Sequence, residues 1–286
     1  MKNALTFDVE EYFHAEAFSR VLRPEEWPTL ESRVTRSTER LLDILDRDGV
    51  RATFFVLGWV ADRHPALVRE IASLGHEIAC HGHGHRMIQH LSRDEFVGDV
   101  TRAKRALEDA TGHPVLGYRA PTFSVMRETL WSLDVLAEAG FRYDSSIFPI
   151  VHDRYGIPDA PRFPHRLKTP SGGEIIEFPP STMLLMGRRV PVAGGGYFRL
   201  FPYRVTRRAI RTLNHREGQP AMVYLHPWEF DPDQPRLPVG PLTRFRHLVN
   251  VGRTEARLVR LLSDLSFASA ADVLAGAGLL VSGGAR

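Results

Sequence analysis

Short apolar runs alternate with segments of helical periodicity along this chain. Residues 52–57 form a continuous β-branched and aromatic run, which is typical of a strand buried on both faces. Similar runs occupy residues 5–9, 175–178 and 221–225. Between the runs, as in residues 37–46, apolar positions recur at helical spacing. Strands that alternate with helices predict parallel β-α units, which assemble into a barrel or a doubly wound sheet.

Glycines mark the expected ends of the helices. Gly tolerates the left-handed conformation that closes many helices, and a strand-like segment follows soon after each of these glycines. The glycines that fit this pattern are Gly49, Gly75, Gly112 and Gly140. These stops divide the first half of the chain into successive helix–strand units.

The length of the chain fits one domain. A single α/β barrel commonly occupies roughly 250 residues, and this chain has 286. Prolines recur from about residue 147 to residue 201, so we expect an irregular insertion there, over one end of the barrel. A helical segment is expected at about residues 241–280. The sequence therefore predicts a single domain over residues 1–286.

The composition is that of an ordinary globular protein, with 43% hydrophobic and 25% charged residues. The single cysteine, Cys80, excludes an internal disulfide. The chain enters a strand pattern without an apolar leader and has no run of about 18 apolar residues, so a cytoplasmic protein is expected. Arginines gather at residues 204–211 and 244–260; they favour a phosphate-bearing or membrane-surface partner, or they form solvated helix faces. No nucleic-acid partner is expected, and the oligomeric state is not predicted.

The first apolar run ends in acidic residues. Side chains two apart on a strand share a face, so Asp8 and Glu10 point the same way while Val9 points into the apolar layer. Two carboxylates this close are unfavourable unless a cation or a proton separates them. The pair therefore indicates a metal site, unless Glu10 and Glu11 merely open a solvated loop.

A histidine cluster at residues 76–85 follows another strand-like run. His81 and His85 are four residues apart, so both imidazoles can turn to one side of a tight loop and bind one ion, and imidazole nitrogen suits zinc and its neighbours. The glycines between them favour a loop over a regular helix. His83 is expected to point elsewhere, and His76 to satisfy a core hydrogen bond.

Three further strand ends carry residues that fit the chemistry of such a metal site. Arg119 precedes a turn fixed by proline, and its planar guanidinium can hold a carboxylate, although a surface salt bridge competes with that role. Asp144 supplies another acid after a strand-like segment. His226 directly follows the run 221–225; at the mouth of a barrel such a histidine is a candidate proton donor, whereas elsewhere it is usually structural.

Taken together, these positions resemble the five motifs of the carbohydrate esterase family 4 deacetylases, also called the NodB-homology polysaccharide deacetylases. The matching segments, in family order, are Thr6-Phe7-Asp8, His81-x-x-x-His85, Arg119-x-Pro121, Asp144 and Leu225-His226. The resemblance spans about residues 4–230. Many members carry a second aspartate directly after the first, where this chain has Val9; Glu10 fits relatives that space the two acids by one residue.

The family resemblance implies a distorted (β/α) barrel that removes N-acetyl groups from amino sugars with a divalent metal, Zn²⁺ in our prediction. The implied metal ligands are His81, His85 and Glu10. Asp8 would act as general base, held by Arg119, and a backbone N–H near Thr122 would stabilise the oxyanion. His226, oriented by Asp144, would protonate the leaving amine.

Three segments resemble more narrowly the subfamily encoded beside exosortase-linked exopolysaccharide loci. These segments are residues 143–149, 194–199 and 226–232. The resemblance implies a role in exopolysaccharide biosynthesis. A cytoplasmic member would meet a lipid-linked precursor at the inner face of the membrane, and the arginines at 204–211 fit that location.

Aromatic side chains are candidates for stacking on a sugar ring, although core packing is their more usual fate. The three candidates are Trp228, Tyr197 and Phe123. Two other functions stay open. A hydrolase of the same fold could cleave a small cyclic amide, as allantoinase-like relatives do, or the chain could bind saccharide without turnover. Binding alone, however, would need neither Asp8 nor His226.

Overall fold

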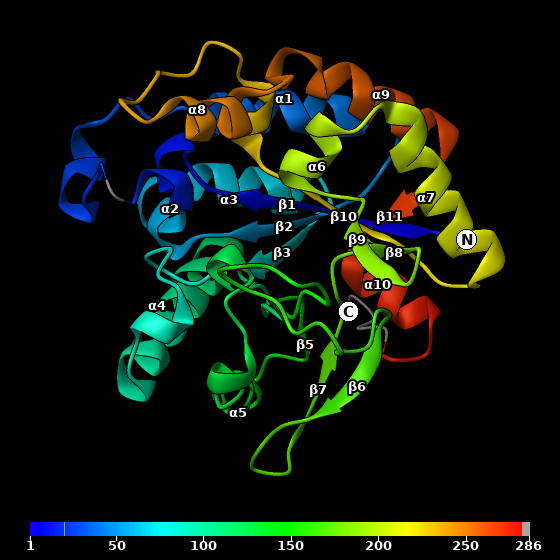
Figure 1. Cartoon of the computed structure of the whole chain (residues 1–286). Helices are drawn as coiled ribbons and strands as arrows, with labels where there is room; N and C mark the ends of the chain where they lie inside the picture. The colour runs from blue at the N-terminus through cyan, green and yellow to red at the C-terminus, as the bar shows by residue number, and fades with distance from the viewer. Residues whose placement is uncertain (20, 282–286) are drawn as a thin grey trace.

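A curved, mostly parallel sheet forms the centre of the molecule, and helices surround it (Figure 1). The computed structural model describes residues 1–19 and 21–281. The strands are β1 (Asn3–Val9), β2 (Thr53–Val56), β3 (Glu77–Cys80), β4 (Gly117–Tyr118), β5 (Tyr143–Asp144), β6 (His165–Lys168), β7 (Glu174–Glu177), β8 (Thr182–Leu185), β9 (Arg188–Pro191), β10 (Met222–Leu225) and β11 (Phe267–Ala268). The helices are α1 (Val34–Arg47), α2 (Gly58–Arg63), α3 (Pro65–Ser73), α4 (Arg93–Thr111), α5 (Ser132–Glu138), α6 (Gly195–Leu200), α7 (Tyr203–Arg216), α8 (Pro241–Leu248), α9 (Thr254–Asp264) and α10 (Ala270–Gly276). Two short 3-10 turns, η5 (Pro121–Phe123) and η7 (Pro227–Phe230), follow β4 and β10.

The main sheet has nine strands, in the order β10-β1-β2-β3-β4-β5-β7-β6, and β11 also pairs with β1. Neighbouring strands are parallel except for β6 and β7. The two ends of this order, β10 and β6, do not pair with each other within the described residues, so the sheet is a half-barrel. The predicted fold, an α/β distorted barrel, is confirmed.

Strand β1 places the first site residues. All seven of its residues are buried, and it pairs with β2 on one edge and with β10 on the other. Phe7 packs on Phe54 with ring centroids 5.1 Å apart; burying such a ring stabilises the fold by roughly 1.5–3 kcal/mol. Because parallel strands end on the same side, the residues that follow β1, β3, β4 and β10 meet at one mouth.

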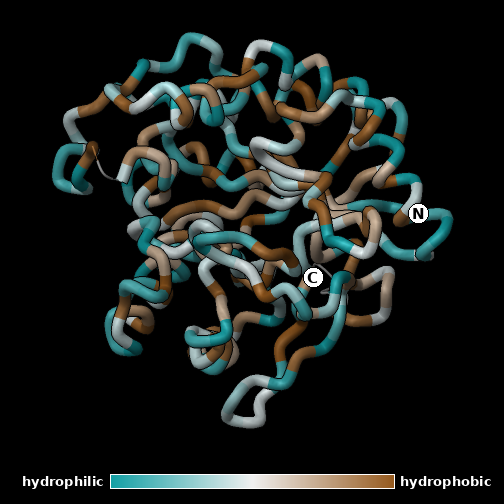
Figure 2. Tube along the Cα trace, viewed as in Figure 1, coloured by the Kyte–Doolittle hydropathy of each residue, from teal (hydrophilic) through white to brown (hydrophobic). Residues whose placement is uncertain are grey.

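The predicted local elements agree with the structure. The apolar runs fall on β1, β2, β7 and β10, and the helical pattern of residues 37–46 falls on α1. The backbone angle φ is positive at all four predicted glycine stops, from 63° at Gly49 to 85° at Gly140. Apolar segments line the interior, as the brown inner strands and teal outer loops of Figure 2 show.

The segment of residues 147–201 is more ordered than expected. Residues 148–164 contain no helix or strand, but β6 and β7 extend the main sheet, β8 and β9 form a separate hairpin, and α6 follows. The prediction of an irregular insertion is therefore wrong for residues 165–201. Strand pairing satisfies the backbone groups there, and the prolines lie at strand ends and in the connections.

The C-terminal segment expected to be helical contains α8, α9 and α10, with β11 between the last two. Among the residues that the structure describes, no helix combines the length and the apolar character needed to cross a bilayer.

Candidate metal and catalytic site

Three donor side chains converge at the mouth of the half-barrel. Glu10 follows β1, His81 and His85 lie on the loop after β3, and one donor atom of each lies within 4.8 Å of the others. Glu10 Oε2 is 2.7 Å from His85 Nε2 and 4.0 Å from His81 Nε2. Two imidazole nitrogens and one carboxylate oxygen form a donor set typical of catalytic zinc sites, which keep a further position open.

Asp99 on α4 shapes the histidine loop. Its carboxylate accepts hydrogen bonds from His83 N at 2.7 Å and Gly84 N at 3.1 Å. A Cβ at Gly82 would lie 3.0 Å from that carboxylate, and φ there is 72°, so only glycine fits without strain. His85 itself has a φ of 50°, an uncommon conformation for a non-glycine residue that is frequent where side chains bind ligands.

Two observations fit a metal ion at this site. His81 Nδ1 lies 2.8 Å from the backbone oxygen of Arg119, so Nδ1 carries the proton and Nε2 presents its lone pair to the site. Burial lowers the pKa of His81 to about 4, so the ring is neutral, as a metal ligand must be. In addition, Glu10 Oε2 is buried, and among the described residues its only close polar neighbours are the two imidazole nitrogens that would share a metal ion with it. A cation at this point would compensate the buried carboxylate charge.

Trp228 supports the Glu10 carboxylate. Its Nε1 donates to Glu10 Oε1 at 3.1 Å, and its ring stacks on His226 and His247 with centroids 5.0 and 4.3 Å away. The side chain is only 7% exposed. Trp228 is therefore packed and supports the candidate donor Glu10, which favours the core-packing alternative over stacking on a sugar ring.

Asp8 faces the same mouth and is held by Arg119. Arg119 Nη1 donates to Asp8 Oδ1 at 2.5 Å and to Thr6 Oγ1 at 2.9 Å, and Nη2 donates to Ser145 Oγ at 3.0 Å. The Arg119 side chain is wholly buried, which excludes the alternative of a surface salt bridge. A paired and buried guanidinium of this kind fixes the orientation of the carboxylate.

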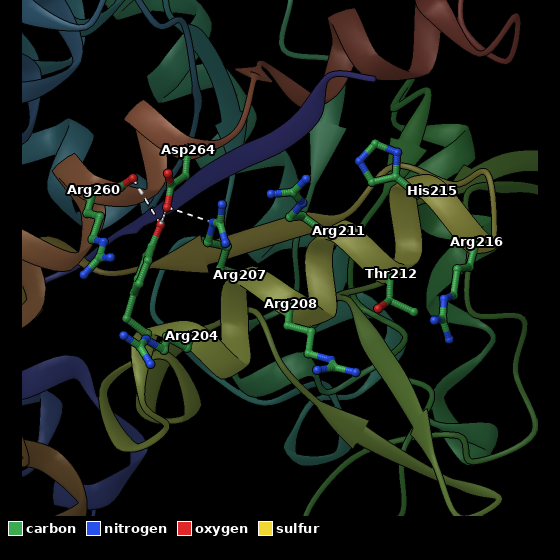
Figure 3. A pocket seen from close by; sticks show the side chains of 10 residues that line it. Arg204, Arg207, Arg208, Arg211, Thr212, His215, Arg216, Arg260 and Asp264 are labelled. Atoms are coloured by element: carbon green, nitrogen blue, oxygen red, sulfur yellow. Dashed lines mark hydrogen bonds and ion pairs between the residues drawn. The ribbon is translucent and has the colours of Figure 1, made fainter.

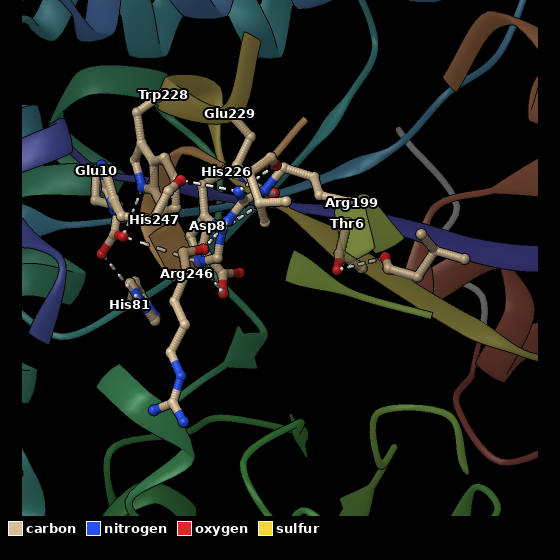
Figure 4. Close-up of polar contacts among 12 residues, drawn as sticks. Thr6, Asp8, Glu10, His81, Arg199, His226, Trp228, Glu229, Arg246 and His247 are labelled. Atoms are coloured by element: carbon tan, nitrogen blue, oxygen red, sulfur yellow. Dashed lines mark hydrogen bonds and ion pairs between the residues drawn. The ribbon is translucent and has the colours of Figure 1, made fainter. Parts of the chain in front are cut away.

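His226 faces both carboxylates from β10 (Figure 4). Its Nε2 lies 3.9 Å from Asp8 Oδ2 and 3.8 Å from Glu10 Oε1. Its Nδ1 lies 2.7 Å from Glu229 Oε1, and Arg199 Nε donates to Glu229 Oε2 at 2.5 Å. Burial lowers the pKa of His226, but Glu229, Glu10 and Asp8 outweigh burial and raise it to about 9.

Asp144 does not orient His226, so that prediction is wrong. Its Oδ1 accepts a hydrogen bond from Ser146 Oγ at 2.5 Å, and Ser146 Oγ accepts one from Ala120 N at 2.7 Å. Asp144 also lies opposite Glu177 on the neighbouring strand, and burial raises the pKa of both carboxyls. Asp144 thus supports the turn after Arg119, while Glu229 holds His226.

The turn η5 contains the predicted oxyanion donor. Thr122 has a φ of 56°, and its backbone N–H donates no hydrogen bond to any described residue, so it is available to a ligand. Phe123 packs on Phe148 and Tyr224 with centroids 5.1 and 4.8 Å away and is buried. Tyr197 on α6 is only half-buried, so it keeps the most exposed surface of the three aromatics predicted to stack on sugar.

Glu229 and Arg199 are absent from the residues predicted from the sequence. A signal exists for Glu229, because His226-Pro227-Trp228-Glu229 has the form of a capping box with proline at the first position, and Glu229 Oε1 accepts a hydrogen bond from His226 N at 3.0 Å. Arg199 lies 30 residues from Glu229, and only the fold brings the two together.

The remaining histidines of the cluster lie outside the site, as predicted. His76 Nδ1 accepts a hydrogen bond from Ala52 N at 3.2 Å, and His83 Nε2 lies 3.0 Å from a carboxylate on α2. A histidine that the sequence did not single out, His14, stacks on His85 with ring centroids 6.2 Å apart. It therefore helps to fix the plane of that imidazole.

Known family models cover the two halves of the chain separately. Residues 4–143 match the polysaccharide deacetylase model, and residues 145–275 match DUF3473, a domain of unknown function. Residues 4–143, just under half of the chain, are thus similar to the polysaccharide deacetylase family. The candidate metal donors and Asp8 lie in the first match, whereas His226 and Glu229 lie in the second.

Named relatives match this chain to different extents. A peptidoglycan-N-acetylglucosamine deacetylase from Bacillus cereus is 28% identical over 120 residues, which are 38% of this chain and 44% of that protein. The match thus spans less than half of that relative. The structure of a proposed polysaccharide deacetylase from Mycobacterium smegmatis is 25% identical, covers 97% of this chain and 91% of that chain, and has a TM-score of 0.63. The structure of Puue allantoinase shares the fold at 17% identity, with a TM-score of 0.59 and coverage of 94% of this chain and 87% of that chain.

Proposed function

We propose that this protein is a metal-dependent hydrolase that removes N-acetyl groups from the amino sugars of a polysaccharide or its lipid-linked precursor. One observation carries the proposal: three metal-type donors, a carboxylate and a histidine meet in one buried mouth. These residues are Glu10, His81, His85, Asp8 and His226. The Bacillus cereus relative is named for N-acetylglucosamine in peptidoglycan, which supports an N-acetylated saccharide as the substrate class.

Glu10, His81 and His85 would hold the metal, and we propose Zn²⁺ because the donor set suits it. When bound, such an ion supplies a water whose pKa is lowered to about 7 and polarises the amide carbonyl.

The side chains around the mouth would carry the proton transfers. Asp8 accepts a proton from the attacking water, because Arg119 holds its Oδ1 and its Oδ2 faces His226. As the water oxygen bonds to the amide carbon, the N–H of Thr122 donates to the oxyanion. His226 Nε2, with Nδ1 held by Glu229, then gives a proton to the amide nitrogen. The C–N bond breaks, and acetate and a free amine leave.

A role in exopolysaccharide biosynthesis is part of the proposal. Two of the segments that resemble the exosortase-linked subfamily, residues 194–199 and 226–232, contain Arg199 and Glu229, the pair that holds His226. A lipid-linked precursor would bring the protein to the inner face of a membrane. The arginines of α7 support that location.

Acetate release from N-acetylated glucosamine oligosaccharides tests the reaction. We expect the purified protein to release acetate, to lose this activity on treatment with a chelator and to regain it when Zn²⁺ is added back. Allantoin, offered in parallel, tests the cyclic-amide alternative. Binding of the oligosaccharide by metal-loaded protein without acetate release would overturn the proposal and support a saccharide-binding protein.

A further inference from the structure

We infer that the outer face of α7 and the β8–β9 hairpin form one surface that docks on an anionic lipid bilayer. This inference deepens the membrane location included in the proposed function, and it depends on surface residues alone. It can hold or fail whether or not the protein hydrolyses amides.

The outer face of α7 is strongly basic. Arg204, Arg208 and Arg211 are exposed and follow helical spacing, so they lie on one stripe of the helix, while its opposite side packs into the core. They line a groove between α7 and α9 together with Arg207 and Arg260 (Figure 3). A row of guanidinium groups on one face suits a surface of phosphates.

The charge of this groove is concentrated and poorly compensated. Its lining contains six arginines and one carboxylate, a formal charge of +5, which exceeds the +3 of the whole chain. The carboxylate, Asp264, binds Arg207 at 2.9 Å and accepts a hydrogen bond from Tyr203. Among the described residues, no carboxylate pairs with Arg204, Arg208 or Arg211. The rest of the surface is therefore slightly negative, which would orient the groove toward an anionic membrane.

The β8–β9 hairpin exposes apolar side chains at its tip. Leu184, Leu185 and Met186 are 52%, 53% and 97% exposed, and Arg188, which is also exposed, lies two residues after Met186. The tight turn has positive φ at both Met186 (49°) and Gly187 (76°). Asn, Asp or Gly normally occupies the first of these positions. A methionine held there in a strained conformation and pointing into solvent fits a tip that enters the boundary between headgroups and acyl chains.

Arg162 joins the hairpin to α7. Its Nη1 donates to Glu217 Oε2 at 2.7 Å, just past the end of α7, and its Nη2 donates to the backbone oxygen of Thr182, the first residue of β8, at 2.6 Å. The base of the hairpin is thus tied to the C-terminal end of α7, and both elements lie on the right of the molecule in Figure 1. Stable peripheral binding needs two signals, and this region supplies an electrostatic one and an apolar one.

Flotation with lipid vesicles tests the inference. We expect the metal-loaded full chain to float with vesicles of phosphatidylcholine and phosphatidylglycerol at low salt, and not with phosphatidylcholine alone. The triple change Arg204→Gln, Arg208→Gln, Arg211→Gln should lower partitioning by about five-fold for each arginine removed. The matched control is Arg93→Gln, Arg102→Gln, Arg105→Gln on α4, which removes the same charge from the other side of the molecule in Figure 1. The control should float like the wild type; equal losses in the two variants would overturn the assigned face.

The hairpin is tested separately. Leu184→Ser, Leu185→Ser, Met186→Ser should lower partitioning by at least about ten-fold, whereas Val151→Ser, at a loop position that is 85% exposed, should not change it. Tryptophan fluorescence of Met186→Trp should shift to the blue and be quenched by brominated lipid. No shift on vesicle binding would overturn insertion of the tip.

Soluble phosphate distinguishes a bilayer from a free anion. At constant ionic strength, inorganic phosphate should not release the protein from the vesicles; release would reassign the arginine face to a small phosphate-bearing ligand and overturn membrane docking. All of these variants should release acetate from a soluble oligosaccharide as the wild type does, because none of the changed residues lies at the mouth. If even the wild type released no acetate, the proposed reaction would fail while the flotation result would stand.

Discussion

Two buried arginine–carboxylate pairs lie at the mouth of the half-barrel, one from each half of the chain. Arg119 holds Asp8 in the half that matches the polysaccharide deacetylase model, and Arg199 holds Glu229 in the half that matches DUF3473. In the first pair the carboxylate itself faces the mouth. In the second pair, the carboxylate lies behind His226 and binds its Nδ1.

In the proposed mechanism this difference divides the chemical work. The first half would contribute the metal donors and the proton acceptor, and the second half would contribute the proton donor and the two residues that hold it. The domain of unknown function is thus half of the candidate site, since the histidine and its support lie within it.

The largest expected effect comes from removing the groups that exchange protons. Asp8→Asn and His226→Ala should each lower kcat by roughly 10²- to 10⁴-fold, the usual contribution of a general base or acid. Both variants should keep their metal, measured by inductively coupled plasma mass spectrometry. Full activity of either variant would remove that residue from the mechanism.

The metal donors give the next test. Glu10→Gln removes the anionic ligand. Mutating residues that only hydrogen-bond to a metal ligand already lowers metal affinity by roughly 10- to 100-fold, so we expect Glu10→Gln to lower zinc affinity by about 100-fold or more. Competition with a chromophoric zinc chelator measures it. Affinity equal to that of the wild type would transfer the ligand role to Asp8.

Two isosteric substitutions test whether Glu229 or Asp144 orients His226. Glu229→Gln removes the charge that holds His226 and should lower kcat by roughly 10- to 100-fold with little change in KM, as expected for a residue that positions a catalytic group. Asp144→Asn is the matched control and should stay within a few-fold of the wild type. The pH profile of kcat should change only in Glu229→Gln. The opposite pattern would restore Asp144 as the partner of His226.

The smallest expected effect is on stability and concerns Glu177, a buried carboxylate that forms no ion pair with an arginine among the described residues. Burial, and then the facing Asp144, raise the pKa of Glu177 well above its usual value. A carboxyl of this kind stabilises the fold fully below its unfolded pKa of about 4.3, and this stability is lost as the pH rises through the higher folded pKa. Glu177→Gln cannot lose a proton, so its Tm should fall less than that of the wild type between about pH 5 and pH 9. Parallel Tm curves from calorimetry would contradict the raised pKa.

The convergence of the candidate metal donors could be predicted from the sequence because their relation is local. Strand alternation alone puts Asp8 and Glu10 on one face, and the spacing of His81 and His85 lets two rings meet on one loop. The parallel β-α pattern then brings both segments to the same mouth. The structure adds the turn at His85 and the distances, but it does not change the donor set.

The residue that orients His226 could not be predicted from the order of the family motifs along the chain. Asp144 lies on β5, which β1, β2, β3 and β4 separate from β10 in the sheet, whereas Glu229 lies one turn beyond His226 itself. Arg199 follows a glycine-rich stretch that shows no helical or strand periodicity. A Cβ at Gly194 would lie 1.9 Å from the Tyr224 ring, so this stretch is shaped by close packing against β10, which only a folded sheet defines.

Because β1 pairs with strands from the end of the chain, part of the sheet can form only late in synthesis. Asn3 and Ala4 of β1 lie in register with Phe267 and Ala268 of β11 on one edge of β1, and β10 pairs with the opposite edge. While the ribosome is still making the middle of the chain, that edge has no strand to join and its apolar side chains stay open to water. Nearly the whole polypeptide must emerge before the N-terminal strand is enclosed, so the nascent protein depends on late, long-range contacts that form slowly.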